Sequence, residues 1–239
     1  MATFIKLKST PIKEIIFTIS FTETISDDRL DVFKEHICAS TEFKAFDKGF
    51  KTQINSQLGI TPTANISSDG YILRCSESSK TIQARRGSFS FHKVKEYESF
   101  DSLTTELKKY WMMFVESCGP LTVNNVGVRY LNLILKTTNE ASNQLVNIKT
   151  THPFGEQVDG FLTQLKLSYK KAPEIKANII IANSKESKEN GVILDIILNR
   201  RVENEKNANV LFGLLGEMRD AKNEIFFQTI TEATIKKYS

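Results

Sequence analysis

The sequence lacks the residues that mark several large classes of protein. Its 239 residues include only three cysteines, Cys38, Cys75 and Cys118, which are far apart and form no CxxC or Cys/His ligand spacing. No stretch approaches the roughly 20 consecutive apolar residues of a membrane-spanning helix. Lysines and a proline interrupt the N-terminal MATFIKLKSTP before an apolar core can form, so we expect no signal peptide. These absences predict a cytoplasmic protein with reduced thiols and no membrane contact.

Catalytic and cofactor motifs are also missing. The chain contains no GxxxxGK[ST], GxGxxG, HExxH or GxSxG pattern. Its three histidines, His36, His92 and His152, are isolated from one another in the sequence. His36 lies two residues from Cys38 on a predicted helix, where the two side chains point to different sides. The sequence therefore favours a non-enzymatic protein, and we expect no cofactor and no metal site.

The charge balance of the chain excludes few classes of protein. The chain has 32 basic and 28 acidic residues, a net charge of +4, and 40% hydrophobic residues, which is ordinary for a globular protein with a sizeable core. A dedicated nucleic-acid-binding protein usually shows a concentrated stripe of lysine and arginine. The mild basic excess here is compatible with nucleic-acid binding but does not indicate it.

Alternating hydrophobic residues predict antiparallel strands in the first half of the chain. The first strand is IKEIIFTISF at residues 12–21, and a short helix in SDDRLDVFKEHI, capped by Ser26 or Asp27, follows it. Residues 50–66 predict one strand and a loop. The segments GYILRCS, KTIQARR and SFSFHKV, joined by short turn-like links, then predict a meander.

Residues 99–118 predict the clearest helix, with apolar residues at spacings of three and four and a stop at Gly119 and Pro120. In the second half, FLTQLKLSY, IKANIIIA and GVILDIIL predict further strands. A second long helix is expected from about Asn207 to Asn223. We also favour helix for the end of the final segment, EIFFQTITEATIKKY, although FFQTIT has strong strand propensity.

These elements predict an α+β fold. Because meander and helix occur twice in the same order, we expect antiparallel meander sheets, each covered by a long amphipathic helix, with two similar halves packed together. The N-terminal half would span residues 1–137 and the C-terminal half residues 159–239. A polar connecting loop, residues 138–158, would join them. A single domain is the alternative.

An arginine lies at the centre of the apolar strand LTVNNVGVRYLNLILK. Both faces of this strand carry apolar residues, which predicts a central strand covered on both sides. A lone buried charge costs several kcal/mol, so we expect Arg129 to form a structural pair with Asp195 in GVILDIIL. In the functional alternative, Arg129, Tyr130 and Asn132 line a cleft that binds an acidic ligand or partner. A third possibility is that Arg129 lies on an exposed edge.

The hairpin QARRGSFSFHK is a second candidate binding site. Two phenylalanines in it, Phe89 and Phe91, are surrounded by four basic or titratable side chains: Arg85, Arg86, His92 and Lys93. This composition is typical of platforms that bind single-stranded nucleic acid. The alternation, however, places both phenylalanines on the core side, which favours a solvated hairpin tip.

Five segments stand in a recognisable order: PIKEIIFTISF, SFSFHKVKEY before the Trp111 helix, VGVRYLN, the LDI strand and a last helix with FFQTIT. In this order they resemble a sporadically distributed family of uncharacterised prokaryotic proteins, over nearly the whole chain. The resemblance implies an RYxN motif at Arg129, Tyr130 and Asn132. It also implies a histidine where this chain has Arg219. The patchy distribution of the family implies mobile genes, such as those of defence or toxin–antitoxin loci.

The leading functional hypothesis is a non-enzymatic cytoplasmic protein that binds or regulates another protein through exposed sheet faces or edges. Two alternatives stay open. One is nucleic-acid binding through the basic hairpin and a lysine cluster formed by Lys166, Lys170 and Lys171. The other is an enzyme with a cryptic site near Arg129, Tyr130 and Asp195.

Overall fold

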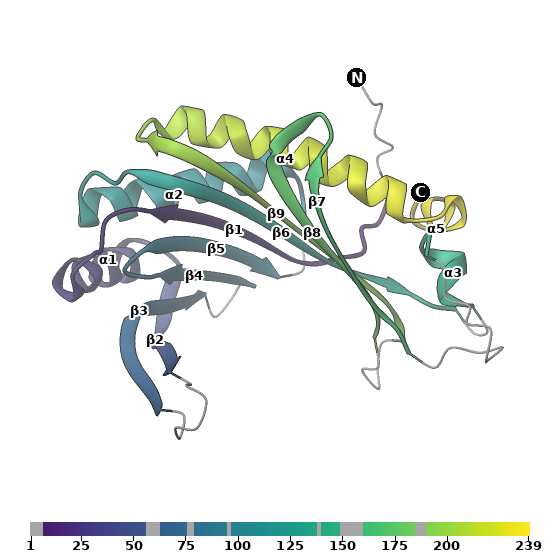
Figure 1. Cartoon of the computed structure of the whole chain (residues 1–239). Helices are drawn as coiled ribbons and strands as arrows, with labels where there is room; N and C mark the ends of the chain where they lie inside the picture. Colours follow the sequence, from purple (N-terminus) through teal and green to yellow (C-terminus); the bar gives the residue numbers. More distant parts are fainter. Residues whose placement is uncertain are drawn as a thin grey trace.

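The computed structural model describes residues 7–55, 63–75, 79–94, 97–137, 140–148, 160–184 and 190–239. The strands in these ranges are β1 (Ile12–Phe21), β2 (Phe43–Asn55), β3 (Thr63–Cys75), β4 (Lys80–Ala84), β5 (Ser88–Val94), β6 (Val123–Leu135), β7 (Leu162–Tyr169), β8 (Ala172–Ser184) and β9 (Gly191–Glu205). The helices are α1 (Asp27–Ser40), α2 (Phe100–Cys118), α3 (Ser142–Leu145), α4 (Ala208–Thr229) and α5 (Glu232–Tyr238). The described strands form one antiparallel sheet in the order β2-β3-β4-β5-β1-β6-β9-β8-β7 (Figure 1).

The continuity of this sheet shows that the predicted arrangement of two packed halves, each with its own sheet and helix, is wrong. β1 pairs with β5 on one side and with β6 on the other, for example at Phe17 and Val128. Strands from both predicted halves therefore belong to a single layer. Pairing between segments so distant in sequence leaves no local pattern, and the sequence periodicity reports only which residues share a face of one strand.

Helices α1, α2 and α4 pack against one face of the sheet (Figure 1). The ring centroid of Phe89 on β5 lies 6.2 Å from that of Phe33 on α1 and 5.7 Å from that of Trp111 on α2. The ammonium nitrogen of Lys222 on α4 lies 4.1 Å from the ring centroid of Tyr130 on β6. The buried core is the space between these helices and this face, which we call the helix side.

The opposite face, which we call the open face, carries no described helix (Figure 1). The register places His92, Ile16, Arg129 and Ile197 in one row across β5, β1, β6 and β9 of this face. Strand β6 is central, as predicted. The expectation that it is covered on both sides is wrong, because the side chain of Arg129 is 40% exposed.

Helix α2 follows the sequence prediction closely. The hydroxyl of Ser99 accepts a hydrogen bond from the backbone N–H of Ser102 at 3.0 Å and caps the first turn. Gly119 ends the helix with a φ of 88°, a left-handed conformation that glycine adopts without strain. Arg29 of α1 donates to the terminal carbonyl of Cys118 at 2.6 Å, which fixes the end of α2 against α1.

Several boundaries differ from the prediction. Strand β2 begins at Phe43, before the strand expected within residues 50–66, and β3 joins residues 63–69 to the predicted strand GYILRCS. The loop residues 56–62 lie outside the described residues. Helix α3 occupies part of the predicted connecting loop, of which residues 138–139 and 149–158 lie outside the described ranges. The final segment is helical, as favoured, in α4 and α5. None of the described helices combines the length and apolar character needed to cross a membrane.

We expect Phe114→Ala to lower the free energy of unfolding by about 3–5 kcal/mol, the usual cost of removing a buried aromatic ring. Phe114 is fully buried, and its ring contacts four aromatic neighbours: Phe21, Phe33, Phe89 and Trp111. Denaturant-induced unfolding followed by circular dichroism measures the change. Met112→Ala is the matched control, because Met112 lies on the same helix and is 49% exposed. Equal losses in both variants would contradict this packing.

Candidate functional site

Arg129 and Asp195 form a two-pronged ion pair on the open face. The guanidinium Nε lies 2.9 Å from Oδ1 of Asp195, and Nη2 lies 2.8 Å from Oδ2. The hydrogen bonds to Asp195 raise the pKa of Arg129. The predicted pair between β6 and β9 is therefore confirmed. It is unequally buried, because the side chain of Asp195 is only 5% exposed whereas that of Arg129 is 40% exposed.

His92 and Glu14 lie beside this pair on the open face. Glu14 Oε1 is 3.2 Å from Nδ1 of His92, and the hydroxyl of Ser90 is 3.3 Å from Nε2. Burial lowers the pKa of His92; Glu14 opposes this shift, and the positive charge of Arg129 reinforces it. The sequence could not group His92 with Arg129, because their proximity depends on the register of three strands.

The predicted RYxN site is divided by the sheet. Arg129 lies on the open face, whereas Tyr130 and Asn132 lie on the helix side and are 0% and 2% exposed. The amide nitrogen of Asn132 donates to the carbonyls of Tyr130 and Leu194, at 3.2 and 2.9 Å. The hydroxyl of Tyr130 has no hydrogen-bond partner among the described residues, and burial raises its pKa. Arg129 and Tyr130 thus cannot line one cleft in this conformation, and Asp195 is likewise separated from Tyr130.

The basic hairpin around β5 is held by acidic neighbours. Arg85 Nη1 lies 3.2 Å from Asp69 Oδ2, and Arg86 Nη2 lies 2.7 Å from Asp27 Oδ2. Lys93 pairs in register with Ile15 of β1. The two ion pairs of Arg85 and Arg86 partly neutralise the charge that a nucleic acid would meet.

Phe89 and Phe91 are both 0% exposed, so the prediction that they face the core is confirmed. They contact Trp111 and Tyr110 of α2. Neither ring is accessible for stacking against a base, which removes the aromatic part of the nucleic-acid platform at this hairpin.

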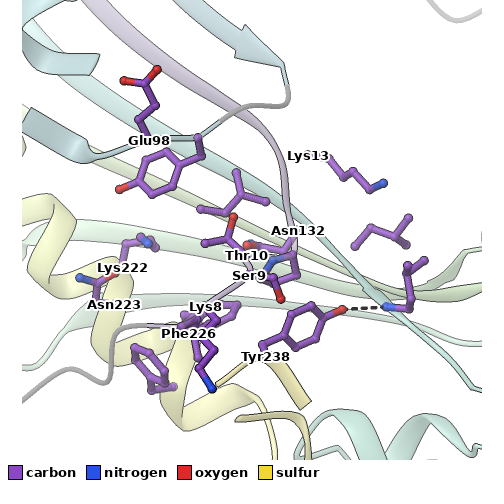
Figure 2. A pocket seen from close by; sticks show the side chains of 17 residues that line it. Lys8, Ser9, Thr10, Lys13, Glu98, Asn132, Lys222, Asn223, Phe226 and Tyr238 are labelled. Atoms are coloured by element: carbon purple, nitrogen blue, oxygen red, sulfur yellow. Dashed lines mark hydrogen bonds between the residues drawn. The ribbon is translucent and has the colours of Figure 1, made fainter. Parts of the chain in front are cut away.

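A cavity of about 810 Å³ opens on the helix side, between residues 7–13, β6, α4 and α5 (Figure 2). Lys222 of α4 and Asn132 of β6 both line it. Lys222 is only 7% exposed, and no described residue forms a hydrogen bond or ion pair with its ammonium group. Its described contacts are with the rings of Tyr130 and Phe226. Burial lowers the pKa of Lys222 to about 8, and the nearby positive charge of Arg219 acts in the same direction.

Sequence reasoning missed Lys222, although a signal was present. The buried residues Leu211, Leu215, Met218 and Phe226 mark the stripe of α4 that faces the sheet. Lys222 lies four residues after Met218 and four before Phe226, so it occupies a position in this stripe that the helical period reserves for apolar side chains. A charged residue at a core position of an amphipathic helix can be recognised from the sequence alone.

The described residues contain no group of three or more histidine, cysteine, aspartate or glutamate side chains arranged to hold a metal ion. No protein-family model matches the chain, and no curated protein matches it in sequence. The resemblance to an uncharacterised prokaryotic family therefore stays a prediction.

The unequal burial of the ion pair predicts unequal mutational costs. The substitution Arg129→Met leaves the buried carboxylate of Asp195 without its partner, and we expect the free energy of unfolding to fall by about 3 kcal/mol. Asp195→Leu leaves Arg129, which water can still hydrate, so we expect less than half of that loss. The double variant should be more stable than Arg129→Met alone. Urea unfolding of the four proteins tests this double-mutant cycle, and strictly additive losses would contradict it.

Lys222 is expected to destabilise the folded chain near neutral pH. Its pKa of about 8, against 10.5 for an ordinary lysine, means that Lys222→Met should raise the free energy of unfolding at pH 7 by up to about 3 kcal/mol.

The advantage of this variant should depend on pH. Between about pH 8 and pH 10.5 the unfolded chain binds more protons at Lys222 than the folded chain does, so the stability of the natural protein rises across this interval. The gap between the two proteins should therefore narrow as the pH rises. Chemical unfolding at pH 7, 8, 9 and 10 measures it. Lys236→Met, at an exposed lysine of α5, is the control, and a gap independent of pH would show that Lys222 is not perturbed.

Proposed function

We propose that the protein binds another protein by pairing the edge strand β7 with a strand of the partner. β7 ends the sheet order and pairs only with β8 among the described strands. Its outer edge therefore presents backbone N–H and C=O groups that an added strand can bind. The observation that carries the proposal is the exposure of three leucines on this strand, Leu162, Leu165 and Leu167, at 73%, 48% and 39%.

Two of the three exposed leucines, Leu165 and Leu167, continue an existing apolar surface. Leu165 pairs with Ile179 and Leu167 pairs with Ala177, and both of these β8 residues are buried. Antiparallel partners share a face, so the two leucines lie on the helix side, at the margin of the core. A partner strand with apolar residues at alternate positions would cover them and extend the core by one strand.

The charge around β7 favours an acidic partner strand. Lysines gather on this strand, on its turn and on the adjacent strand: Lys166, Lys170, Lys171 and Lys176, all of them exposed. The ammonium group of Lys171 is 2.5 Å from the carboxylate of Glu224 on α4. The remaining positive charge is complementary to glutamate or aspartate, and opposite charges across neighbouring strands stabilise their pairing.

The proposal keeps the non-enzymatic binding role that the sequence favours. A partner encoded in a defence or toxin–antitoxin locus is a further proposal, and it is supported by the family resemblance alone. Nucleic-acid binding through the lysine cluster is the competing proposal, and it requires phosphates in place of partner carboxylates.

The edge-strand proposal is tested by site-specific photocrosslinking in the cells that express the protein. With p-benzoylphenylalanine in place of Leu162, we expect a crosslinked protein that is missing when the same group replaces Val32, a 54% exposed residue of α1. Leu165→Lys with Leu167→Lys should reduce the crosslink at position 162 at least tenfold, because two charges then face the apolar side of the partner strand.

Val32→Lys is the matched surface change, and it should leave the crosslink at position 162 intact. Three results would contradict the proposal: equal crosslinking at positions 162 and 32, crosslinks only to a second copy of this chain, or crosslinks to nucleic acid that disappear as salt is raised.

A further inference from the structure

The cavity beside Lys222 contains a buried cation without a counter-ion among the described residues. Glu98 is the acidic residue among those that line the cavity. Its carboxylate accepts a hydrogen bond from the hydroxyl of Ser102 at 3.3 Å and points away from Lys222 (Figure 2). Two further lysines, Lys8 and Lys13, also line the cavity. A buried ammonium group without a partner favours an anion supplied from outside.

We propose that this cavity binds a small monocarboxylate with an apolar body, and that Lys222 contacts its carboxylate. The lining of this cavity includes no residue of the edge strand β7, and the proposal does not rest on the partner proposed for that strand. The volume of about 810 Å³ lies within the range of about 300–1,000 Å³ typical of pockets for small molecules.

The walls of the cavity suit an apolar body. Phe226 and Phe227 of α4 and Tyr97 of the segment before α2 are among the residues that line it, and they supply aromatic surface; Phe226 is labelled in Figure 2. These side chains come from α4 and from the segment before α2, so the cavity has apolar surface on more than one side. Burial of a chain of about ten carbons against such walls supplies a large part of the binding free energy.

Asn132 adds a polar contact of defined direction. Its amide nitrogen already donates to two backbone carbonyls, at 3.2 and 2.9 Å. No described residue donates to its side-chain oxygen, which is therefore available as an acceptor at the cavity wall. A hydroxyl or amine on the ligand can bind this oxygen, whereas a carboxylate oxygen cannot, which leaves Lys222 as the contact for the acid group.

A monocarboxylate fits the lining better than a phosphate does. Phosphate sites generally combine arginine forks, backbone N–H groups or a helix N-terminus, which together satisfy several oxygens. No arginine is among the residues that line this cavity, and Lys222 lies in the second half of α4, far from its N-terminus. One buried ammonium group matches one negative charge.

Competitive displacement of 11-(dansylamino)undecanoic acid from the purified full-length protein tests the proposal. Its fluorescence should rise on binding. Decanoate, decanol and decylamine have the same chain length and differ in head-group charge. We expect decanoate to displace the probe at a concentration about tenfold or more below that of decanol, because a hydrogen bond to a charged group distinguishes the two. Decylamine should fail to displace it, because its charge repels Lys222.

Lys222→Met should abolish the preference: decanoate should bind about tenfold or more weakly, while decanol keeps its affinity. Lys236→Met and Leu165→Lys should behave as the natural protein does, and the second of these separates the cavity from the edge strand. The proposal fails if the probe does not bind, if decanol displaces it as well as decanoate does, or if Lys222→Met keeps the preference. The first two results need no variant, so a folding defect in Lys222→Met cannot obscure them.

Discussion

The pairing of β1 with β6 at the centre of the sheet determines which side chains of these strands face the helices and which lie on the open face. It sets Ile15 beside Tyr130 on the helix side and Ile16 beside Arg129 on the open face. A slip of one residue would exchange the two faces, because successive side chains of a strand point in opposite directions. The buried aromatic cluster on one face opposes such a slip, since it would move Tyr130 and Val128 into water.

The two faces of β6 place a cation in two different environments. Arg129 meets Asp195 through two parallel hydrogen bonds, and water reaches the rest of its guanidinium. Lys222, on the other face, lies against the ring of Tyr130 with no described counter-ion. A cation over an aromatic ring gains about 2 kcal/mol or somewhat more when desolvated, which is less than the cost of burying an unpaired ammonium group. An anion in the cavity would remove this imbalance and stabilise the folded chain by linkage.

The local elements could be predicted from the sequence, and the long-range arrangement could not. The bounds of β1 and the extent of α2 follow from patterns within about 20 residues. The Arg129–Asp195 pair was also predictable, because a charge in an apolar strand requires a partner of opposite sign. Its exposure was misjudged, because β6 itself carries partly exposed apolar residues such as Leu131 and Leu135 on the open face, and these make its sequence resemble that of a strand covered on both sides.

Helix α4 contacts both the cavity and the end of the edge strand. Glu224 accepts a hydrogen bond from the hydroxyl of Tyr169, the last residue of β7, at 2.6 Å, and lies two residues after Lys222. Residues two apart on a helix are separated by about 200° around its axis, so Lys222 faces β6 while Glu224 faces the β7–β8 turn. A displacement of α4 that accompanied filling of the cavity would therefore act directly on the anchoring of β7. The two proposed sites are distinct in chemistry, but they depend on the position of the same helix.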